Sequence, residues 1–160
     1  MRTTALEICS AIDAYLLRMP GVRIVSHSWE EALKEGLPSS QVRVASPFIK
    51  DGAVKSLFGS HCPGSLQVLT RFNLDHFDEG VSDLPALRRL LRLGARVRGV
   101  RRLHAKVYIF DEARAVITSA NLTQAGLAKN HELGVVAEGG EIPRQCRRYF
   151  DELWDVRVAL

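Results

Sequence analysis

The sequence lacks any long apolar run. No segment approaches the ~18 consecutive apolar residues that a membrane-spanning helix needs. The opening segment, MRTTALEICSAIDAY, carries acidic residues where a secretory signal would be apolar. We therefore expect a cytoplasmic protein that does not insert into a membrane.

Cysteine is scarce as well. The three cysteines, Cys9, Cys62 and Cys146, are an odd number, lie far apart and include no CxxC pair. This spacing favours neither a disulfide framework nor a zinc site. His61 beside Cys62 could ligate a metal, but adjacent side chains rarely chelate together. We expect reduced, mostly buried thiols, no metal site and no cofactor.

The chain also lacks internal repeats, low-complexity runs and linkers rich in Pro, Gly or Ser. Its 160 residues, 46% of them hydrophobic, suit one globular domain with a real core. Because nothing marks a boundary, we expect a single domain over residues 1–160.

Charge is mildly basic overall and strongly basic in one segment. The formal net charge is +4 and the pI is near 9.2. From Arg88 to Arg102, the segment RRLLRLGARVRGVRR holds seven arginines and no acid. A solvated helix face would explain the first three of them. The later arginines, among them Arg98, Arg101 and Arg102, lead toward the polar strand described below, where they would attract a polyanion.

Apolar residues at helical spacing predict helices at residues 1–18, 29–36, 51–60, 83–93 and 141–156. Ser28 and Glu31 have the form of a capping box, and Ser82 is a candidate N-cap. The apolar side of the fourth helix is predicted to contain Leu84, Leu87, Leu90 and Leu91. The apolar face of the last helix is predicted to contain Ile142, Cys146, Tyr149, Phe150, Leu153 and Trp154.

Alternating runs predict strands at residues 42–48, 65–72, 95–100, 103–110, 115–119 and 132–138. The first two strands flank a short helix, and this βαβ order favours a parallel pair. The last three strands follow one another closely, which favours antiparallel pairing. The sequence therefore predicts an α/β fold with a mixed sheet of about six or seven strands sandwiched between helices.

One of these strands carries polar residues in an apolar setting. In LHAKVYIF, the alternation places His104 and Lys106 on the same face. Ser119 and Asn121, also two residues apart, end the next strand, and a hairpin turn around 111–114 would bring the two pairs together. Imidazole, ammonium, hydroxyl and carboxamide groups suit a phosphoryl group. From alternation alone, an exposed sheet edge that happens to be polar remains an alternative.

These residues resemble the signature of the phospholipase D superfamily. His104, Lys106 and Asp111 match its HxKxxxxD motif, and the segment TSAN at 118–121 matches the trailing GSxN. Glu132 follows eleven residues after Asn121, where single-motif nucleases of the superfamily have a glutamate. The resemblance implies one phospholipase D-like catalytic domain over residues 1–160. Thr118 departs from the pattern, since it adds bulk where glycine would let the backbone approach a phosphate.

The resemblance also implies a mechanism. His104 would attack phosphorus and form a phosphohistidine. The non-bridging oxygens would be held by Lys106, Ser119 and Asn121. Glu132 would orient the imidazole, and we expect Asp111 to tie the hairpin turn rather than touch phosphate.

The family mechanism needs a second HxK motif, whose histidine acts as the general acid, but this chain has only one. The other histidines, His27, His61, His76 and His131, sit in no matching context. The resemblance therefore implies a homodimer with the active site at its two-fold interface.

As a short chain with a single motif, the protein resembles the nucleases of the superfamily, and this resemblance implies a metal-independent nuclease. The arginines support a nucleic-acid backbone, DNA or RNA, as the substrate. Two alternatives stay open. One is a hydrolase of lipids or other phosphodiesters of the phospholipase D type, and the other is a catalytically silent nucleic-acid-binding dimer.

Overall fold

The computed structural model describes residues 21–59 and 63–155. The predicted helix at residues 1–18, Cys9 and the pair His61–Cys62 lie outside these described residues.

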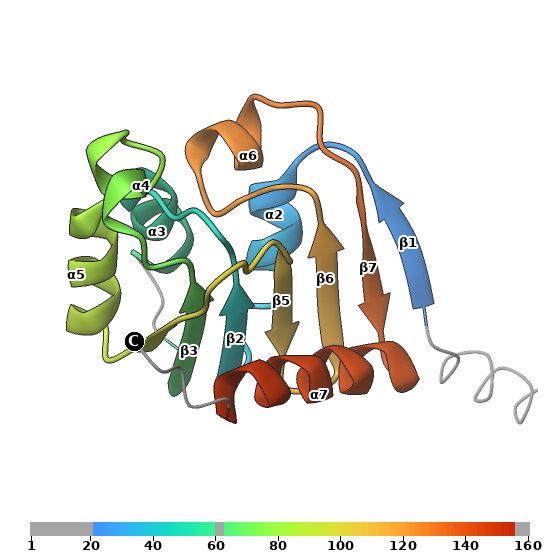
Figure 1. Cartoon of the computed structure of the whole chain (residues 1–160). Helices are drawn as coiled ribbons and strands as arrows, with labels where there is room; N and C mark the ends of the chain where they lie inside the picture. The colour runs from blue at the N-terminus through green and yellow to red at the C-terminus, as the bar shows by residue number, and fades with distance from the viewer. Residues whose placement is uncertain (1–20, 60–62, 156–160) are drawn as a thin grey trace, which may run out of the picture.

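One mixed sheet of seven strands, in the order β1-β7-β6-β5-β2-β3-β4, forms the centre of the protein (Figure 1). The strands are β1 (Gly21–Val25), β2 (Gln41–Ala45), β3 (Ser65–Thr70), β4 (Arg96–Gly99), β5 (Val107–Phe110), β6 (Arg114–Thr118) and β7 (Gly134–Glu138). β2 and β4 both run parallel to β3, which lies between them. All the other neighbouring pairs are antiparallel. The predicted mixed sheet, its parallel pair and its antiparallel run are confirmed.

Two strands differ most from the prediction. β1 was missed, because its five residues lie directly between two predicted helices and offer too short a window for a periodic pattern. β5 begins at Val107 and not at residue 103, so residues 103–106 approach the sheet as irregular chain.

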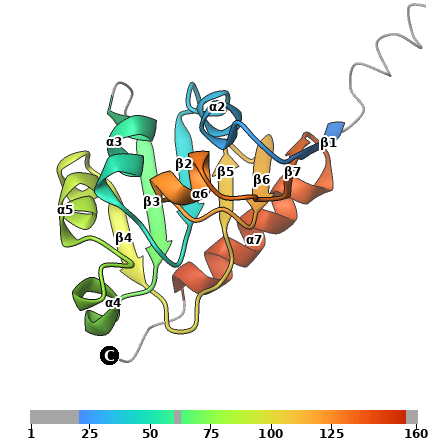
Figure 2. The same ribbon diagram turned by 90° about the horizontal axis from the view of Figure 1, so that it is seen from above.

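The described helices cover both faces of the sheet. They are α2 (Trp29–Lys34), α3 (Asp51–Phe58), α4 (Leu74–Asp78), α5 (Leu84–Arg92), α6 (Gln124–Ala128) and α7 (Glu141–Asp155). Figure 2 shows α7 on one face and α2, α3 and α6 on the opposite face. The predicted α/β sandwich is therefore confirmed, and the short helices α4 and α6 are additions to it.

Two predicted helix caps are wrong. Ser28 is the N-cap of α2, but its φ of 55° is left-handed and its side chain makes no capping hydrogen bond. A capping hydroxyl normally reaches the first-turn amides from an extended backbone. The N-cap of α5 is Asp83, and the Ser82 hydroxyl instead accepts a hydrogen bond of 3.4 Å from the backbone N–H of Ile49.

The predicted apolar faces of α5 and α7 are only partly buried. In α5, Ala86 and Leu90 are buried, whereas Leu84 and Leu91 are 53% and 59% exposed. In α7, Phe150 and Trp154 are buried and stack with ring centroids 5.6 Å apart. The predicted face residues Ile142 and Tyr149 are exposed. The sheet lies against a narrower stripe of each helix than the leucine and aromatic spacing suggested.

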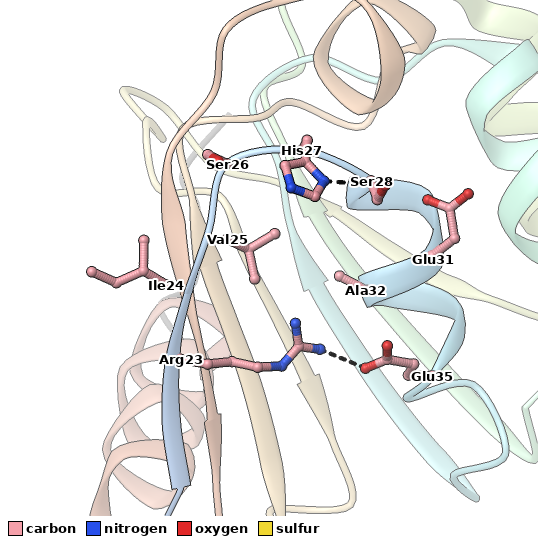
Figure 3. A pocket seen from close by; sticks show the side chains of 9 residues that line it. All are labelled: Arg23, Ile24, Val25, Ser26, His27, Ser28, Glu31, Ala32 and Glu35. Atoms are coloured by element: carbon pink, nitrogen blue, oxygen red, sulfur yellow. Dashed lines mark hydrogen bonds and ion pairs between the residues drawn. The ribbon is translucent and has the colours of Figure 1, made fainter.

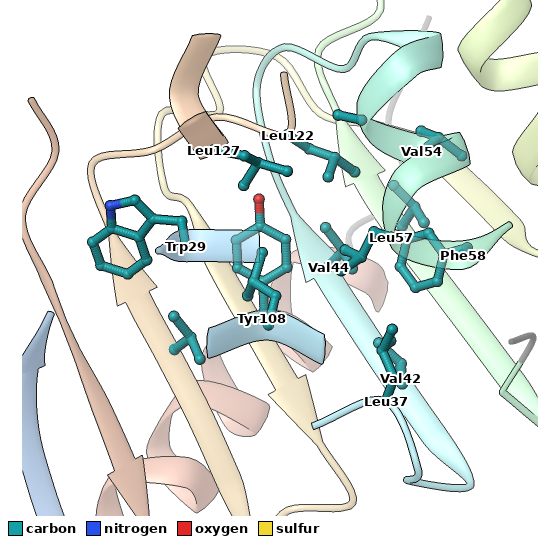
Figure 4. Packing of buried hydrophobic residues seen from close by; sticks show 14 of the residues in the cluster. Trp29, Leu37, Val42, Val44, Val54, Leu57, Phe58, Tyr108, Leu122 and Leu127 are labelled. Atoms are coloured by element: carbon teal, nitrogen blue, oxygen red, sulfur yellow. The ribbon is translucent and has the colours of Figure 1, made fainter. Parts of the chain in front are cut away.

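The core lies in two layers, one on each side of the sheet. Tyr108 and Phe110 belong to the larger layer, shared with α2, α3 and α6 (Figure 4). Val107 and Ile109 belong to the smaller layer under α7, together with Leu103. The predicted alternation is thus confirmed for residues 107–110, which form β5.

Burial alters the acidity of two groups, one fully buried and one half-buried. Tyr108 is fully buried, and this burial raises the pKa of its phenol. Cys146 is a half-buried free thiol on α7, and burial raises its pKa too. A raised pKa keeps Cys146 protonated, as expected for a structural cysteine.

Candidate active site

The candidate site lies at one edge of the sheet, at the top of Figure 1. β6 ends there at Thr118, while β5 and β7 begin there at Val107 and Gly134. The backbone N–H of Thr118 donates to the carbonyl oxygen of Lys106 at 3.1 Å. The β5–β6 hairpin therefore brings the segment of His104 and Lys106 beside the end of β6.

Lys106 and His104 are in direct contact. The Lys106 side chain is buried, and its Nζ donates to the backbone carbonyl oxygen of His104 at 2.9 Å. The same Nζ lies 3.5 Å from Nδ1 and 3.4 Å from Nε2 of the His104 ring. His104 itself is exposed. The site thus presents an accessible imidazole against a largely buried ammonium group.

The surroundings of Lys106 make it a weaker base than a free lysine. Burial lowers the pKa of its ammonium group, and the nearby Arg71 guanidinium lowers it further. The carboxylate of Glu132 acts in the opposite direction and raises this pKa. These influences place a second cation and a carboxylate within electrostatic reach of Lys106.

Ser119 and Glu132 are joined across the site. The Ser119 hydroxyl donates to one carboxylate oxygen of Glu132 and accepts from the backbone N–H of Leu133 at 3.1 Å. The other Glu132 oxygen accepts from Nδ2 of Asn130 at 3.1 Å. Glu132, predicted to orient the imidazole, is thus held by Ser119 and Asn130 in this structure.

Asn121 lies in a rigid loop between β6 and α6. Its side chain is half-buried, and its Oδ1 is buried without a hydrogen-bond partner. The next residue, Leu122, is fully buried, and its N–H donates to the Ser46 hydroxyl at 3.0 Å. α6 packs closely on this loop, since a Cβ at Gly126 would lie 2.6 Å from the Asn121 carbonyl oxygen. The Asn121 carboxamide is thus held on a rigid support, and no donor among the described residues satisfies its Oδ1.

The side chain of Thr118, which replaces the expected glycine, points into the protein. The side chain is buried, and its hydroxyl accepts from the backbone N–H of Ala120 at 3.0 Å. In the β6–β7 register it lies opposite Gly134, where a Cβ would come within 2.2 Å of the Ile117 carbonyl oxygen. The extra methyl and hydroxyl groups of Thr118 are thus accommodated inside the protein.

Asp111 does not lie with the other motif residues. It follows the last residue of β5, at the opposite end from Lys106. Its carboxylate accepts from the backbone N–H of Gln41 at 2.7 Å and from the N–H and hydroxyl of Ser40, both at 3.0 Å. Burial alone would raise the pKa of Asp111, but these hydrogen bonds outweigh it and keep the pKa below its usual range. Asp111 therefore ties the β5–β6 turn to the start of β2.

A family described as "Cardiolipin synthase, PLD-like domain" has a model that matches residues 8–154. The chain belongs to the phospholipase D superfamily. A comparison with curated proteins found no match.

Solved structures share the fold of this phospholipase D-like domain. The phospholipase D family member Nuc from Salmonella typhimurium is 17% identical, with a TM-score of 0.68 over 86% of this chain and 95% of that one. NucT from Helicobacter pylori is 14% identical, with a TM-score of 0.65 over 86% of this chain and 97% of that one. TrmBL2, an archaeal chromatin protein, is 16% identical, with a TM-score of 0.57 over 94% of this chain and 62% of that one.

The arginines predicted to bind nucleic acid have different surroundings in this phospholipase D-like domain. The Arg98 guanidinium lies 4.7 Å from the ring centroid of Trp154 and donates to the Trp154 carbonyl oxygen, so it holds the end of α7. Arg101 and Arg102 are exposed in the turn that leads to His104. Arg102 has a left-handed φ of 58°.

Arg71 was missed by sequence reasoning. It follows the last residue of β3, and its Nε donates to the carbonyl oxygen of Leu103, directly before His104, at 2.6 Å. Its guanidinium also lies 5.7 Å from the ring centroid of Phe48. The signal that could have found it was the position of Arg71 at the carboxyl end of a predicted parallel strand, where α/β sheets commonly bind ligands.

Two further features bear on the chemistry of the domain. Among residues 21–59 and 63–155, no group of three or more His, Cys, Asp or Glu side chains could hold a metal ion. Within the same described ranges, no helix has the length and apolarity needed to cross a membrane.

A separate pocket of about 170 Å³ lies between β1 and α2 (Figure 3). An ion pair of 2.6 Å between Arg23 and Glu35 spans it, and His27 lies at its upper end. None of the predicted catalytic residues lines this pocket.

Proposed function

We propose that this domain is a metal-independent phosphodiesterase that cleaves nucleic acid, DNA or RNA, through a covalent phosphohistidine on His104. The observation that carries the proposal is the exposed His104 imidazole 3.4 Å from the buried ammonium group of Lys106. A nucleophile beside a fixed cation is the pair that attack on a phosphodiester anion requires.

In the first step, a ring nitrogen of His104 attacks phosphorus. A phosphorus–nitrogen bond forms and the bond to the leaving oxygen breaks, while a general acid protonates that oxygen. In the second step, water attacks the phosphohistidine, the phosphorus–nitrogen bond breaks, and the same acid group, now a base, takes the proton of the water. The non-bridging oxygens are held by Lys106, Ser119 and Asn121.

In this proposal Glu132 orients the His104 ring once Ser119 has released it. Ser119 has one hydroxyl proton, which it donates to Glu132 in the free protein. When this proton turns to a phosphate oxygen, one carboxylate oxygen of Glu132 is released. Glu132 can then accept from the second nitrogen of the His104 ring and keep the attacking nitrogen unprotonated.

The substrate assignment rests on charge. Arg101 and Arg102 are exposed three and two residues before His104, where they can bind the phosphates that flank the scissile one. The archaeal chromatin protein TrmBL2, whose fold is similar, binds DNA, which supports the same class of ligand here. A lipid hydrolase and a silent nucleic-acid-binding dimer are the competing functions, and the assay below separates all three.

We expect the protein to cleave labelled DNA or RNA oligonucleotides in the presence of EDTA, because the proposed site uses imidazole, ammonium, hydroxyl and amide groups. Phosphatidyl vesicles serve as the competing substrate in the same buffer. Loss of cleavage in EDTA with recovery in magnesium would contradict metal independence. Cleavage of vesicles alone would favour the lipid function, and binding without turnover would favour the silent module.

The general acid is proposed to be His104 of a second copy across a two-fold axis. If each active site needs both copies of His104, a mixed dimer of wild-type and His104→Ala chains cannot complete turnover. After random subunit exchange, an equal mixture should keep about one quarter of full activity, whereas independent sites would keep about half.

A mixture of wild type with Lys55→Ala, an exposed position on α3, is the matched control and should keep full activity. Light scattering gives the oligomeric state of each preparation. A wild-type protein that cleaves at full rate as a monomer would refute the shared site.

A further inference from the structure

Phe72 is an exposed aromatic residue beside the candidate active site. It follows Arg71 in the segment between β3 and α4, and 57% of its surface is exposed. A single exposed apolar residue is ordinary in a soluble protein. The position of Phe72 is more specific, because three contacts hold its segment along the chain that leads to His104.

These contacts follow one another in order. The backbone N–H of Val100 donates to the carbonyl oxygen of Thr70 at 2.8 Å. A Cβ at Gly99 would lie 2.9 Å from the Cβ of Phe72, so only glycine lets the two segments approach so closely. Arg71 then bonds the carbonyl oxygen of Leu103 at 2.6 Å. Residues 70–72 therefore run beside residues 99–103, and Phe72 lies next to the turn that carries the exposed arginines.

The ring of Phe72 is supported on one side by the half-buried ring of Phe77. It meets the ring of Phe77 on α4 edge-on, with centroids 5.4 Å apart and an angle of 60° between the rings. The neighbouring residues Arg71 and His76 both contact Phe48, with the Arg71 guanidinium 5.7 Å and the His76 ring centroid 5.2 Å from the centroid of its ring. An aromatic ring that is fixed on one side and open on the other is a platform for stacking.

Charge limits the path of a ligand past this platform. Arg71, Arg101 and Arg102 lie on the side toward His104, whereas α4 brings the exposed acids Asp75 and Asp78 on the other side. A polyanion is expected to follow the arginines and avoid α4. Its phosphates then pass the candidate site while a neighbouring base can reach Phe72.

We propose that Phe72 stacks on an unpaired base next to the scissile phosphate, so that the domain acts on single-stranded nucleic acid. This inference rests on the proposed function and names its substrate class. A base within a duplex is already stacked on both faces and paired, so it cannot reach Phe72. Base stacking on an aromatic side chain together with cationic contacts to the backbone is the usual chemistry of single-strand binding.

The test measures the binding of a single-stranded oligonucleotide that carries 2-aminopurine. All variants are made in the His104→Ala protein, so that the oligonucleotide is not cleaved. Stacking quenches the fluorescence of this base. We expect Phe72→Leu, which keeps an apolar side chain but loses the aromatic face, to bind the single strand about tenfold more weakly and to quench less. Phe72→Tyr should restore both readouts, and duplex binding should be the same in all three proteins.

Leu91→Ala is the matched control, because Leu91 on α5 is 59% exposed and lies outside the segment described above. It should leave binding and quenching unchanged. The inference would be overturned if Phe72→Leu lost single-strand and duplex binding equally, or lost neither. It would also be overturned if light scattering showed that Phe72→Leu converts a dimer to a monomer. Stacking without cleavage by the wild-type protein would instead overturn the proposed nuclease function and leave the stacking site in place.

Discussion

Replacing His104 by alanine is expected to abolish cleavage while the fold is retained. The variant loses the proposed nucleophile and, in a dimer with a shared site, the general acid as well, so turnover should fall by a factor on the order of 10⁴ to 10⁶. The His104 side chain is exposed, so the melting temperature should change little. Single-turnover cleavage of a labelled oligonucleotide and thermal unfolding measure the two quantities.

His27→Ala is the matched control, because His27 is also exposed but lines the pocket between β1 and α2. It should cleave at the wild-type rate. Phosphohistidine trapped from wild type by an acid quench and absent from His104→Ala would support the covalent step. Near wild-type cleavage by His104→Ala would show that another residue is the nucleophile.

Replacing Lys106 by methionine is expected to have the second largest effect. Methionine has a similar length but cannot donate to a phosphate oxygen, and loss of one such donor typically costs about 10² to 10³ in turnover. Because the ammonium group of Lys106 is desolvated by burial, the apolar replacement should not lower the melting temperature. Lys55→Met, at an exposed position on α3, is the control and should change neither quantity.

The pH profile gives Lys106 a distinctive signature. Its pKa is lowered in the folded protein, chiefly by burial, so it loses its proton at a lower pH than a free lysine does. Turnover by wild type should fall as pH rises through this lowered pKa. In the window up to the ordinary lysine pKa the unfolded chain binds more protons than the folded one, so the contribution of Lys106 to stability increases with pH. In Lys106→Met both pH dependences should disappear, and their persistence would assign them to another group.

Much of the β5–β6 hairpin was predictable from the sequence. The alternation of residues 103–110 correctly assigned Tyr108 and Ile109 to opposite faces of the sheet. The spacing of the polar pairs correctly placed Lys106 beside the end of β6. Both follow from periodicity and a short turn, which are local properties of the chain.

Residues that meet through long-range packing could not be found in this way. Arg71 reaches the site only because β3 ends at the same edge of the sheet at which β5 begins. Arg98, predicted from its place in a basic segment to bind nucleic acid, lies over Trp154 of α7, a contact that no local pattern predicts. Asp111 fits the motif by spacing, yet the length of β5 carries it away from Lys106.

The sequence by itself determined the α/β class, the order of the predicted elements and the motif residues. Alternation, helical spacing and motif spacing are local properties, and each can be recognised within a short segment of the sequence. Only the tertiary structure decided which of these residues share the site, which helix faces are buried, and that Phe72 and Arg71 flank the segment leading to His104. The physical reason is that the order of strands in a sheet sets which distant segments become neighbours. That order depends on packing over the whole core and not on any one segment.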